Sequence, residues 1–126
     1  MIVEDEETVR SFAARALRQG GYDVVETGSA EEAVELLKAG RDIDLVFTDV
    51  ILSSKSGLEL VEELQSLRPG MPALLSSGYA DQKSHWELIQ ERGLPFLKKP
   101  YAVADLLSRV KDLLEESAAE GSGTPV

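Results

Sequence analysis

The sequence predicts an α/β fold, a three-layer α/β/α sandwich built around a five-stranded parallel sheet. Short apolar runs of strand length alternate along the chain with longer segments whose apolar residues recur at helical spacing. Gly and Pro residues separate these segments. Strands that alternate with helices form right-handed βαβ units, which makes the sheet parallel and covers both of its faces with helices. At 126 residues, the chain has the length of one domain with one core.

The composition is that of a soluble globular protein, with 43% hydrophobic and 29% charged residues. The formal net charge of −10 argues against direct binding of nucleic acid, because phosphate backbones are held by clustered Lys and Arg. The chain has no cysteine, and hence no disulfide and no thiolate site. It also shows no signal peptide and no apolar run of about 18 residues. We therefore expect a cytoplasmic protein that does not insert into a membrane.

The first part of the chain predicts two strands and two helices. Residues 2–3 are expected to end a short strand that runs into an acidic turn. Residues 9–17 carry apolar side chains at helical spacing, and a glycine pair stops this helix. Residues 22–25 alternate weakly between apolar and polar types and predict the second strand. Ser29 begins a capping box for a helix whose apolar stripe covers residues 30–37.

The third strand has the clearest signal. Residues 44–50 place four apolar or β-branched residues between two aspartates, a run too short for a helix and too apolar for a loop. They predict a strand buried on both faces, with Asp49 at the C-terminal end, where open parallel sheets bind their ligands. A helix with an apolar stripe over residues 60–67 follows. Residues 72–77 then predict a fourth apolar strand, which ends in two hydroxyls.

The last part of the chain predicts two more helices and one strand. Residues 81–92 are weakly amphipathic and are expected to form a helix; its single histidine, His85, receives no role. Residues 94–98 predict the fifth strand, and residues 103–114 carry the clear apolar stripe of the last helix. Residues 117–126 are mostly small and polar, and predict a flexible tail.

Parallel strands bring their C-terminal ends to one edge of the sheet, whatever their separation in sequence. The residues expected at this edge are Glu4, Asp5, Asp49, Ser77 and Lys99. Carboxylates that converge repel one another and raise a pKa, unless a hard divalent cation such as Mg²⁺ lies among them. A lysine ammonium and a serine hydroxyl beside them would hold an anion with several oxygens. Phosphoryl transfer needs such a set of groups.

Four short segments stand at these strand ends, Glu4-Asp5-Glu6, Asp49, Ser77-Gly78-Tyr79 and Lys99-Pro100-Tyr101. In this order they resemble the receiver domain of two-component response regulators, the CheY-like superfamily. The resemblance implies a flavodoxin-like (CheY-like) doubly wound sheet with the strand order 2-1-3-4-5. It also implies a receiver domain over residues 1–116, followed by a flexible C-terminal tail over residues 117–126.

The resemblance makes Asp49 the phosphoacceptor and Mg²⁺ the cofactor. The metal ligands that it implies are the side chains of Glu4, Asp5 and Asp49 and the backbone carbonyl of Ile51. All of these donors are oxygen atoms, which are the ligands that Mg²⁺ prefers.

Three further roles follow from the same resemblance. It makes Ser77 the switch hydroxyl, Lys99 the base that contacts the phosphoryl group, and Phe96 the aromatic switch residue. It also makes the Lys99–Pro100 bond a candidate cis peptide. Lys98, the neighbouring lysine, is expected to face solvent, because alternation along a strand sends it to the other side.

The function expected from this resemblance is that of a phosphoacceptor receiver domain in a two-component phosphorelay. A histidine kinase or a histidine phosphotransfer protein would donate the phosphoryl group to Asp49, which would switch partner binding. The chain would be a signalling domain and not an enzyme, although it would assist its own aspartyl phosphorylation and autodephosphorylation. We expect a monomer or a weak homodimer. The segments Ser77-Gly78-Tyr79 and Phe96-Leu97-Lys98-Lys99-Pro100 resemble those of receivers attached to hybrid sensor histidine kinases. The start at Met1 without a leader agrees with such a source, which we therefore expect.

Two other classes of protein stand as alternatives. A pseudo-receiver would keep the fold as a docking module without being phosphorylated. A phosphohydrolase of the haloacid-dehalogenase type would also use an Asp nucleophile, but it needs a second Asp two residues later as its general acid. Ile51 occupies that place, which disfavours the hydrolase.

Overall fold

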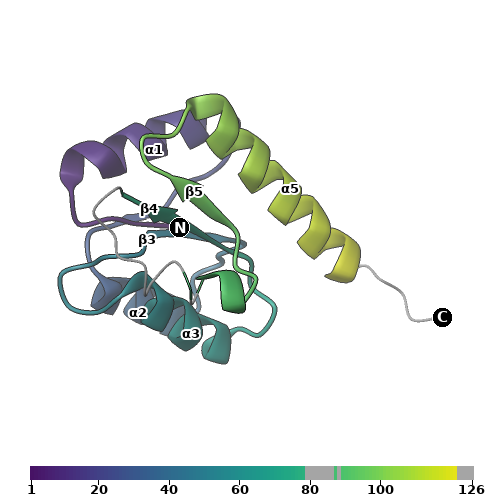
Figure 1. Cartoon of the computed structure of the whole chain (residues 1–126). Coiled ribbons are helices and arrows are strands. Elements are labelled where there is room, and N and C mark those ends of the chain that lie inside the picture. The colour runs from purple at the N-terminus through teal and green to yellow at the C-terminus, as the bar shows by residue number, and fades with distance from the viewer. Residues whose placement is uncertain (79–86, 88, 122–126) are drawn as a thin grey trace.

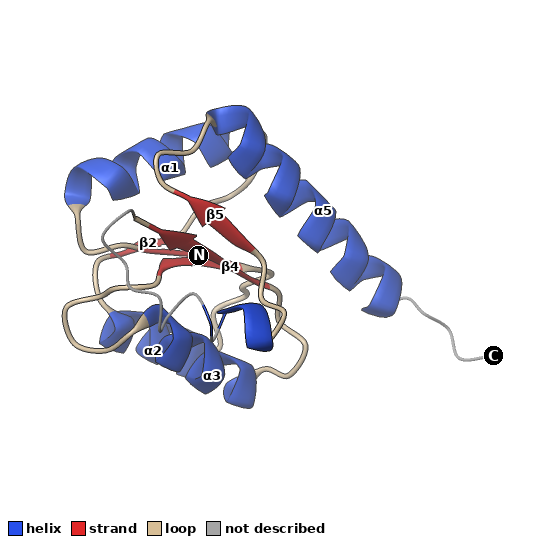
Figure 2. Cartoon of the chain, in the orientation of Figure 1, coloured by secondary structure: helices blue, strands red, loops and turns tan. Residues whose placement is uncertain are grey.

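A sheet of five parallel strands forms the middle layer of the domain (Figures 1 and 2). The computed structural model describes residues 1–78, 87 and 89–121. The strands are β1 (Ile2–Val3), β2 (Glu26–Thr27), β3 (Val46–Asp49), β4 (Ala73–Ser77) and β5 (Phe96–Lys98). Their order across the sheet is β2-β1-β3-β4-β5, which confirms the predicted order.

Helices cover both faces of the sheet, as the sequence predicts. They are α1 (Glu7–Gln19), α2 (Ala30–Lys38), α3 (Gly57–Leu67) and α5 (Val103–Gly121). In Figure 1, α1 and α5 lie on one side of the sheet, and α2 and α3 lie on the other. Within the helix predicted at residues 81–92, residues 87 and 89–91 are helical, whereas residues 81–86 and 88, including His85, lie outside the described residues.

Alternating side chains of the strands divide the core into two halves. Val3 and Val46 are fully buried in the cluster that contains the apolar faces of α2 and α3. Their neighbours Ile2 and Phe47 are buried in the other cluster, with α1 and α5. Successive side chains of a strand point to opposite faces, so a strand in this position must be apolar on both. The prediction that the third strand is buried on both faces is confirmed.

The second strand lies later in the sequence than its apolar pattern predicts. The pattern places it at residues 22–25, whereas β2 consists of Glu26 and Thr27. Pairing with β1 decides the position, because Ile2 is in register with Glu26 and the amide of Ile2 donates to the carbonyl of Val25 at 2.8 Å. The apolar run therefore leads into the edge of the sheet, and the hydrogen-bonded ladder begins only where β1 is available as a neighbour.

The last helix is longer than its apolar stripe. It continues to Gly121, beyond residue 117, where the sequence predicts the start of a flexible tail. Residues 118–120 are Ala-Ala-Glu, all strong helix formers, and a glycine follows them. Intrinsic helix propensity thus favours the continuation of the helix beyond its apolar stripe. None of the described helices is long and apolar enough to cross a membrane.

Candidate functional site

Asp49 ends β3 at the C-terminal edge of the sheet, as predicted. The chain then turns sharply, and the amide of Gly57 at the start of α3 donates to the carbonyl of Val50 at 2.6 Å. A Cβ at position 57 would overlap the backbone carbonyl of Asp49. Only glycine allows α3 to approach this closely, so Gly57 sets the position of the loop that carries Ile51.

Lys99 joins two carboxylates at this edge. Its Nζ lies 2.9 Å from Oδ2 of Asp49 and 3.4 Å from Oε2 of Glu4. The side chains of Glu4 and Asp49 are only 5% and 12% exposed, and that of Lys99 is 23% exposed. The backbone amide of Lys99 donates to the carbonyl of Ser77 at 2.7 Å, which anchors the residue to the end of β4. Four of the five predicted strand-end residues, all except Asp5, are therefore tied together through backbone or side-chain contacts.

Burial and like charge make Glu4 a weak acid. Desolvation, followed by the nearby charge of Asp49, raises the pKa of Glu4 to about 7. The amide of Glu6, which donates to Oε1 of Glu4 at 3.1 Å, and the Lys99 ammonium oppose this shift. Burial by itself would lower the pKa of Lys99, but its hydrogen bond and ion pair with Asp49, reinforced by Glu4, raise it. One ammonium thus incompletely neutralises two buried carboxylates.

The structure does not bring all three predicted metal-ligand carboxylates together. Asp5 is exposed, whereas Glu4 and Asp49 share Lys99. Across residues 1–78, 87 and 89–121, no group of three His, Cys, Asp or Glu side chains is arranged to hold a metal ion. The donor chemistry nevertheless fits Mg²⁺, because the three carboxylates and the carbonyl of Ile51 are all oxygen donors on one edge of the sheet. A bound cation would also favour the charged form of Glu4.

Of the two predicted switch residues, Ser77 lies at this edge, whereas Phe96 lies at the start of β5. Ser77 is half-buried at the end of β4, and its hydroxyl donates to the carbonyl of Gly78 at 3.5 Å. Phe96 is half-buried and packs against the core on the side of α2 and α3. The peptide bond between Lys99 and Pro100 is cis, the isomer that the resemblance implies.

A comparison with protein-family models identifies the chain. The model of the response regulator receiver domain matches residues 1–111. The chain belongs to this family. As a receiver domain it is a module of two-component signalling, not a classical enzyme.

Similar proteins agree with this assignment. The receiver is 35% identical over 117 residues to the sensor kinase CckA of Brucella abortus, and 31% identical over 119 residues to the transcriptional regulatory protein CusR of Escherichia coli. These alignments cover 92% and 94% of the receiver, but only 12% of CckA and 52% of CusR. A CheY-like receiver domain protein of Methanospirillum hungatei is 28% identical, with a TM-score of 0.85 and 94% of each chain covered.

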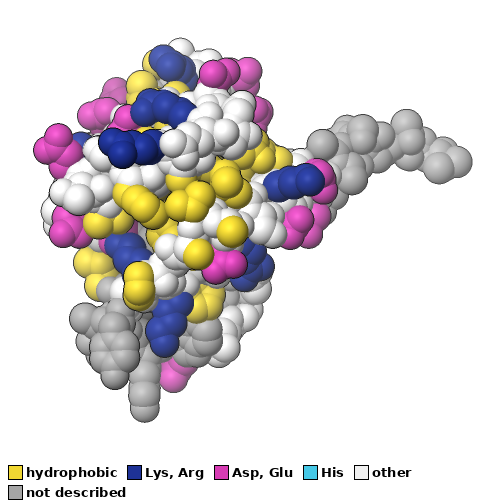
Figure 3. Space-filling view, turned by 90° about the horizontal axis from the view of Figure 1, so that it is seen from above, with side chains coloured by type: hydrophobic (Ala, Val, Ile, Leu, Met, Phe, Trp, Pro, Cys, Tyr) yellow, Lys and Arg dark blue, Asp and Glu magenta, His cyan; other side chains and the backbone are white. Residues whose placement is uncertain are grey.

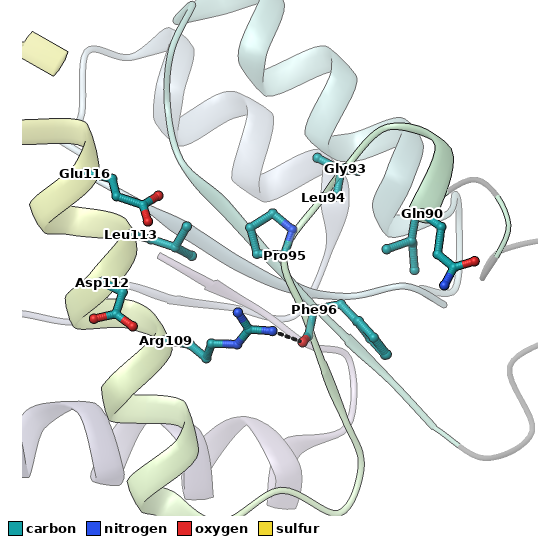
Figure 4. Close-up of a pocket in the computed structure, with 10 residues that line it drawn as sticks. Gln90, Gly93, Leu94, Pro95, Phe96, Arg109, Asp112, Leu113 and Glu116 are labelled. Carbon is teal, nitrogen blue, oxygen red and sulfur yellow. Dashed lines mark hydrogen bonds between the residues drawn. The ribbon is translucent and has the colours of Figure 1, made fainter.

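The receiver also has a groove between α5 and the segment that leads into β5 (Figure 4). Phe96 lies on one side, and Arg109 reaches across from α5 to donate to the carbonyl of Phe96 at 3.2 Å. The lining combines apolar and charged side chains: Ile89, Gln90, Gly93, Leu94, Pro95, Phe96, Arg109, Asp112, Leu113 and Glu116. Phe96, a predicted switch residue three positions before Lys99, is therefore one of the residues that line the groove.

Sequence reasoning missed two residues that contact the site. Tyr101 packs edge-on against Phe47 and Phe12, with ring centroids 5.8 and 6.2 Å away, and Phe12 is 48% exposed on α1. Figure 3, which looks down on the molecule from above the view of Figure 1, shows hydrophobic side chains gathered between charged ones on this face. Arg10 donates to the backbone carbonyl of Glu4 at 2.8 Å. A bond to a carbonyl leaves no spacing pattern, whereas Tyr101 could have been found from its place after Lys99-Pro100.

Proposed function

We propose that this receiver accepts a phosphoryl group on Asp49 from a phosphohistidine of a histidine kinase or a histidine phosphotransfer protein. A carboxylate oxygen of Asp49 attacks phosphorus and forms a new O–P bond. The N–P bond of the donor breaks, and the imidazole that leaves takes up a proton. The observation that carries the proposal is the contact of Lys99 Nζ with Asp49 at 2.9 Å and with Glu4 at 3.4 Å on the ligand-binding edge of the sheet.

Each residue of the edge has a role in this transfer. Lys99 places an ammonium beside the oxygens of the incoming phosphoryl group, where negative charge is concentrated. Glu4, Asp5, Asp49 and the carbonyl of Ile51 would hold Mg²⁺. When bound, the metal neutralises charge on the phosphoryl oxygens. The side chain of Asp49 is only 12% exposed, which limits the number of waters around its carboxylate and strengthens these electrostatic interactions.

Phosphorylation would then change the affinity for a partner. The hydroxyl of Ser77 would turn toward the phosphoryl group, and Phe96 would follow the change in packing. Since Phe96 lines the groove in Figure 4, its movement would reshape a surface on which a partner can bind. The domain would also assist the hydrolysis that removes its own phosphoryl group.

The setting of the receiver follows from charge and from its relatives. A net charge of −10 supports a domain that does not itself bind nucleic acid and that works in the cytoplasm with protein partners. The similarity to the sensor kinase CckA supports an origin in a hybrid sensor histidine kinase. We infer a monomer or a weak homodimer.

Acetyl phosphate with Mg²⁺ tests the proposal. Intact mass measurement should show one added phosphoryl group on the wild type and none on Asp49→Asn. Asp44→Asn, an exposed aspartate just before β3, is the matched control and should be modified like the wild type. A wild type without adduct would indicate a pseudo-receiver that serves as a docking module. Steady turnover of unrelated phosphate esters would indicate a hydrolase.

A further inference from the structure

Arg10 lies next to the acidic pair without being part of it. From α1, its Nη1 donates to the backbone carbonyl oxygen of Glu4 at 2.8 Å. Its Nε lies 3.8 Å from Oε1 of Glu26 on β2, and its side chain is only 21% exposed. The guanidinium is therefore held between the turn after β1 and the edge strand of the sheet.

The hydrogen bond from Arg10 orients one particular peptide unit. The carbonyl of Glu4 and the amide of Asp5 belong to the same planar group, so a bond that holds this carbonyl also holds the plane. The preceding peptide unit is anchored by the sheet, because the amide of Glu4 donates to the carbonyl of Thr27 at 3.1 Å. The sheet and Arg10 thus hold the two successive peptide units that flank the α-carbon of Glu4. The second of these units joins Glu4 to Asp5.

Gly28 leaves the space that this arrangement needs. A Cβ at position 28 would lie 3.1 Å from Nη1 of Arg10 and 4.0 Å from the carbonyl oxygen of Glu4. The φ angle of Gly28 is not positive, so its backbone conformation is open to other residues. What this glycine supplies is room for the guanidinium.

We propose that Arg10 is a positioning residue for Mg²⁺: it holds the Glu4–Asp5 peptide so that both carboxylates can reach the metal. This inference rests on the proposed function, since it uses the same metal site. Charge alone leads to the opposite expectation, because a nearby guanidinium repels Mg²⁺ and its removal would tighten binding. Glu26 offsets that repulsion only in part, because its carboxylate also pairs with Arg18 at 3.0 Å. The sign of the change in Mg²⁺ affinity therefore separates positioning from charge.

Calorimetric titration of the full chain with MgCl₂, without a phosphodonor, measures this sign. Arg10→Ala should raise the Kd for Mg²⁺ about 10-fold, as is typical when a group that orients a metal ligand is lost. Arg15→Ala, which removes the same charge from an exposed position of α1, should leave the Kd unchanged. At saturating Mg²⁺, Arg10→Ala should be phosphorylated by acetyl phosphate at the wild-type rate. A residue that served only the stability of the fold would not produce this split.

A double-mutant cycle with Gly28→Ala completes the test. Gly28→Ala should weaken Mg²⁺ binding by displacing the guanidinium, and it should have no further effect in the Arg10→Ala background. Unchanged or tighter binding in a folded Arg10→Ala variant would overturn the inference. So would an effect of Gly28→Ala that persists without Arg10. If Arg10→Ala does not fold, the Kd of Gly28→Ala for Mg²⁺ is the test: a raised Kd supports the inference, and an unchanged or lower Kd overturns it. Absence of Mg²⁺ binding to the wild type would contradict the proposed function itself, together with this inference.

Discussion

At the scale of single residues, one ammonium keeps two buried carboxylates side by side. Lys99 contacts both Glu4 and Asp49, and yet the pKa of Glu4 is raised to about 7. Removing one member of such a cluster leaves the others without compensation, which makes the edge of the sheet sensitive to protonation and to cations. Glu4, which belongs to this edge, therefore lowers the stability of the fold when it is charged.

This cost predicts a pH dependence in the metal-free protein. The pKa of Glu4 is about 7 in the folded state, above the ordinary value of 4.5 for a glutamate, so Glu4 binds more protons when folded. Its stabilising contribution is fully present below pH 4.5, falls as the pH rises, and is lost above about pH 7. Urea unfolding in a chelator should show this decline for the wild type and a flatter profile for Glu4→Gln. Glu35→Gln, an exposed site on α2, should behave like the wild type, and equal slopes for Glu4→Gln and wild type would refute the assignment.

At the scale of elements, the approach of α3 to β3 shapes the loop of the phosphoacceptor. Ser56 caps α3, since its hydroxyl accepts from the amide of Glu59 at 3.1 Å, and Gly57 then touches the backbone of Asp49. A short isolated bridge pairs Ile51 with Ser56 across the loop. The loop is therefore closed at its base by backbone contacts.

Gly57→Ala should break the close backbone contact between α3 and Asp49 that closes the loop. The added Cβ would overlap the carbonyl of Asp49, so α3 must move, at a cost of about 2 kcal/mol of unfolding free energy. Phosphorylation by acetyl phosphate should slow as well, because Asp49 and the carbonyl of Ile51 shift together. Gly40→Ala is the control: its φ of +87° makes alanine strained by about 1 kcal/mol, in open space and in a different loop. A normal phosphorylation rate in Gly57→Ala would argue against a tightly set loop.

At the scale of the whole molecule, β5 connects the reactive edge to the groove. Lys99 follows this strand, and Phe96 begins it in register with Leu75 of β4. Arg109 ties the carbonyl of Phe96 to α5. A shift of Lys99 toward a phosphoryl group is thus connected to the groove through only three residues of strand.

Amide NMR spectra should report this connection. On addition of acetyl phosphate and Mg²⁺, signals of Phe96, Arg109 and Leu113 should shift in the wild type and stay in place in Asp49→Asn, because only a phosphorylated Asp49 redirects Lys99. Arg109→Ala should lose the coupling at α5 but still be phosphorylated. Changes confined to the residues around Asp49 would show that the groove is not part of the switch.

Several features of the site and fold could be predicted because their signals are local. The strand at 44–50, its burial on both faces and the position of Asp49 at its end all follow from a short apolar run between two acids. The alternation of strands and helices was sufficient to predict that the sheet is parallel, and the family resemblance supplied the strand order. The hydroxyl of Ser29 caps α2 as predicted, accepting from the amide of Glu32 at 3.1 Å, whereas the amide of Ser29 donates to Oγ1 of Thr27 in place of the Glu32 side chain of a full capping box.

The sequence by itself determined the layers, the C-terminal ends of the strands that form the site, and the types of group that gather there. Only the tertiary structure decided which of those groups meet: Glu4 is buried under Lys99, its neighbour Asp5 faces solvent, and Arg10 binds the carbonyl between them. It also decided that β2 begins at Glu26. Apolar periodicity is a property of each segment alone. Strand register, side-chain contacts and pKa shifts depend instead on how segments distant in sequence come together in space.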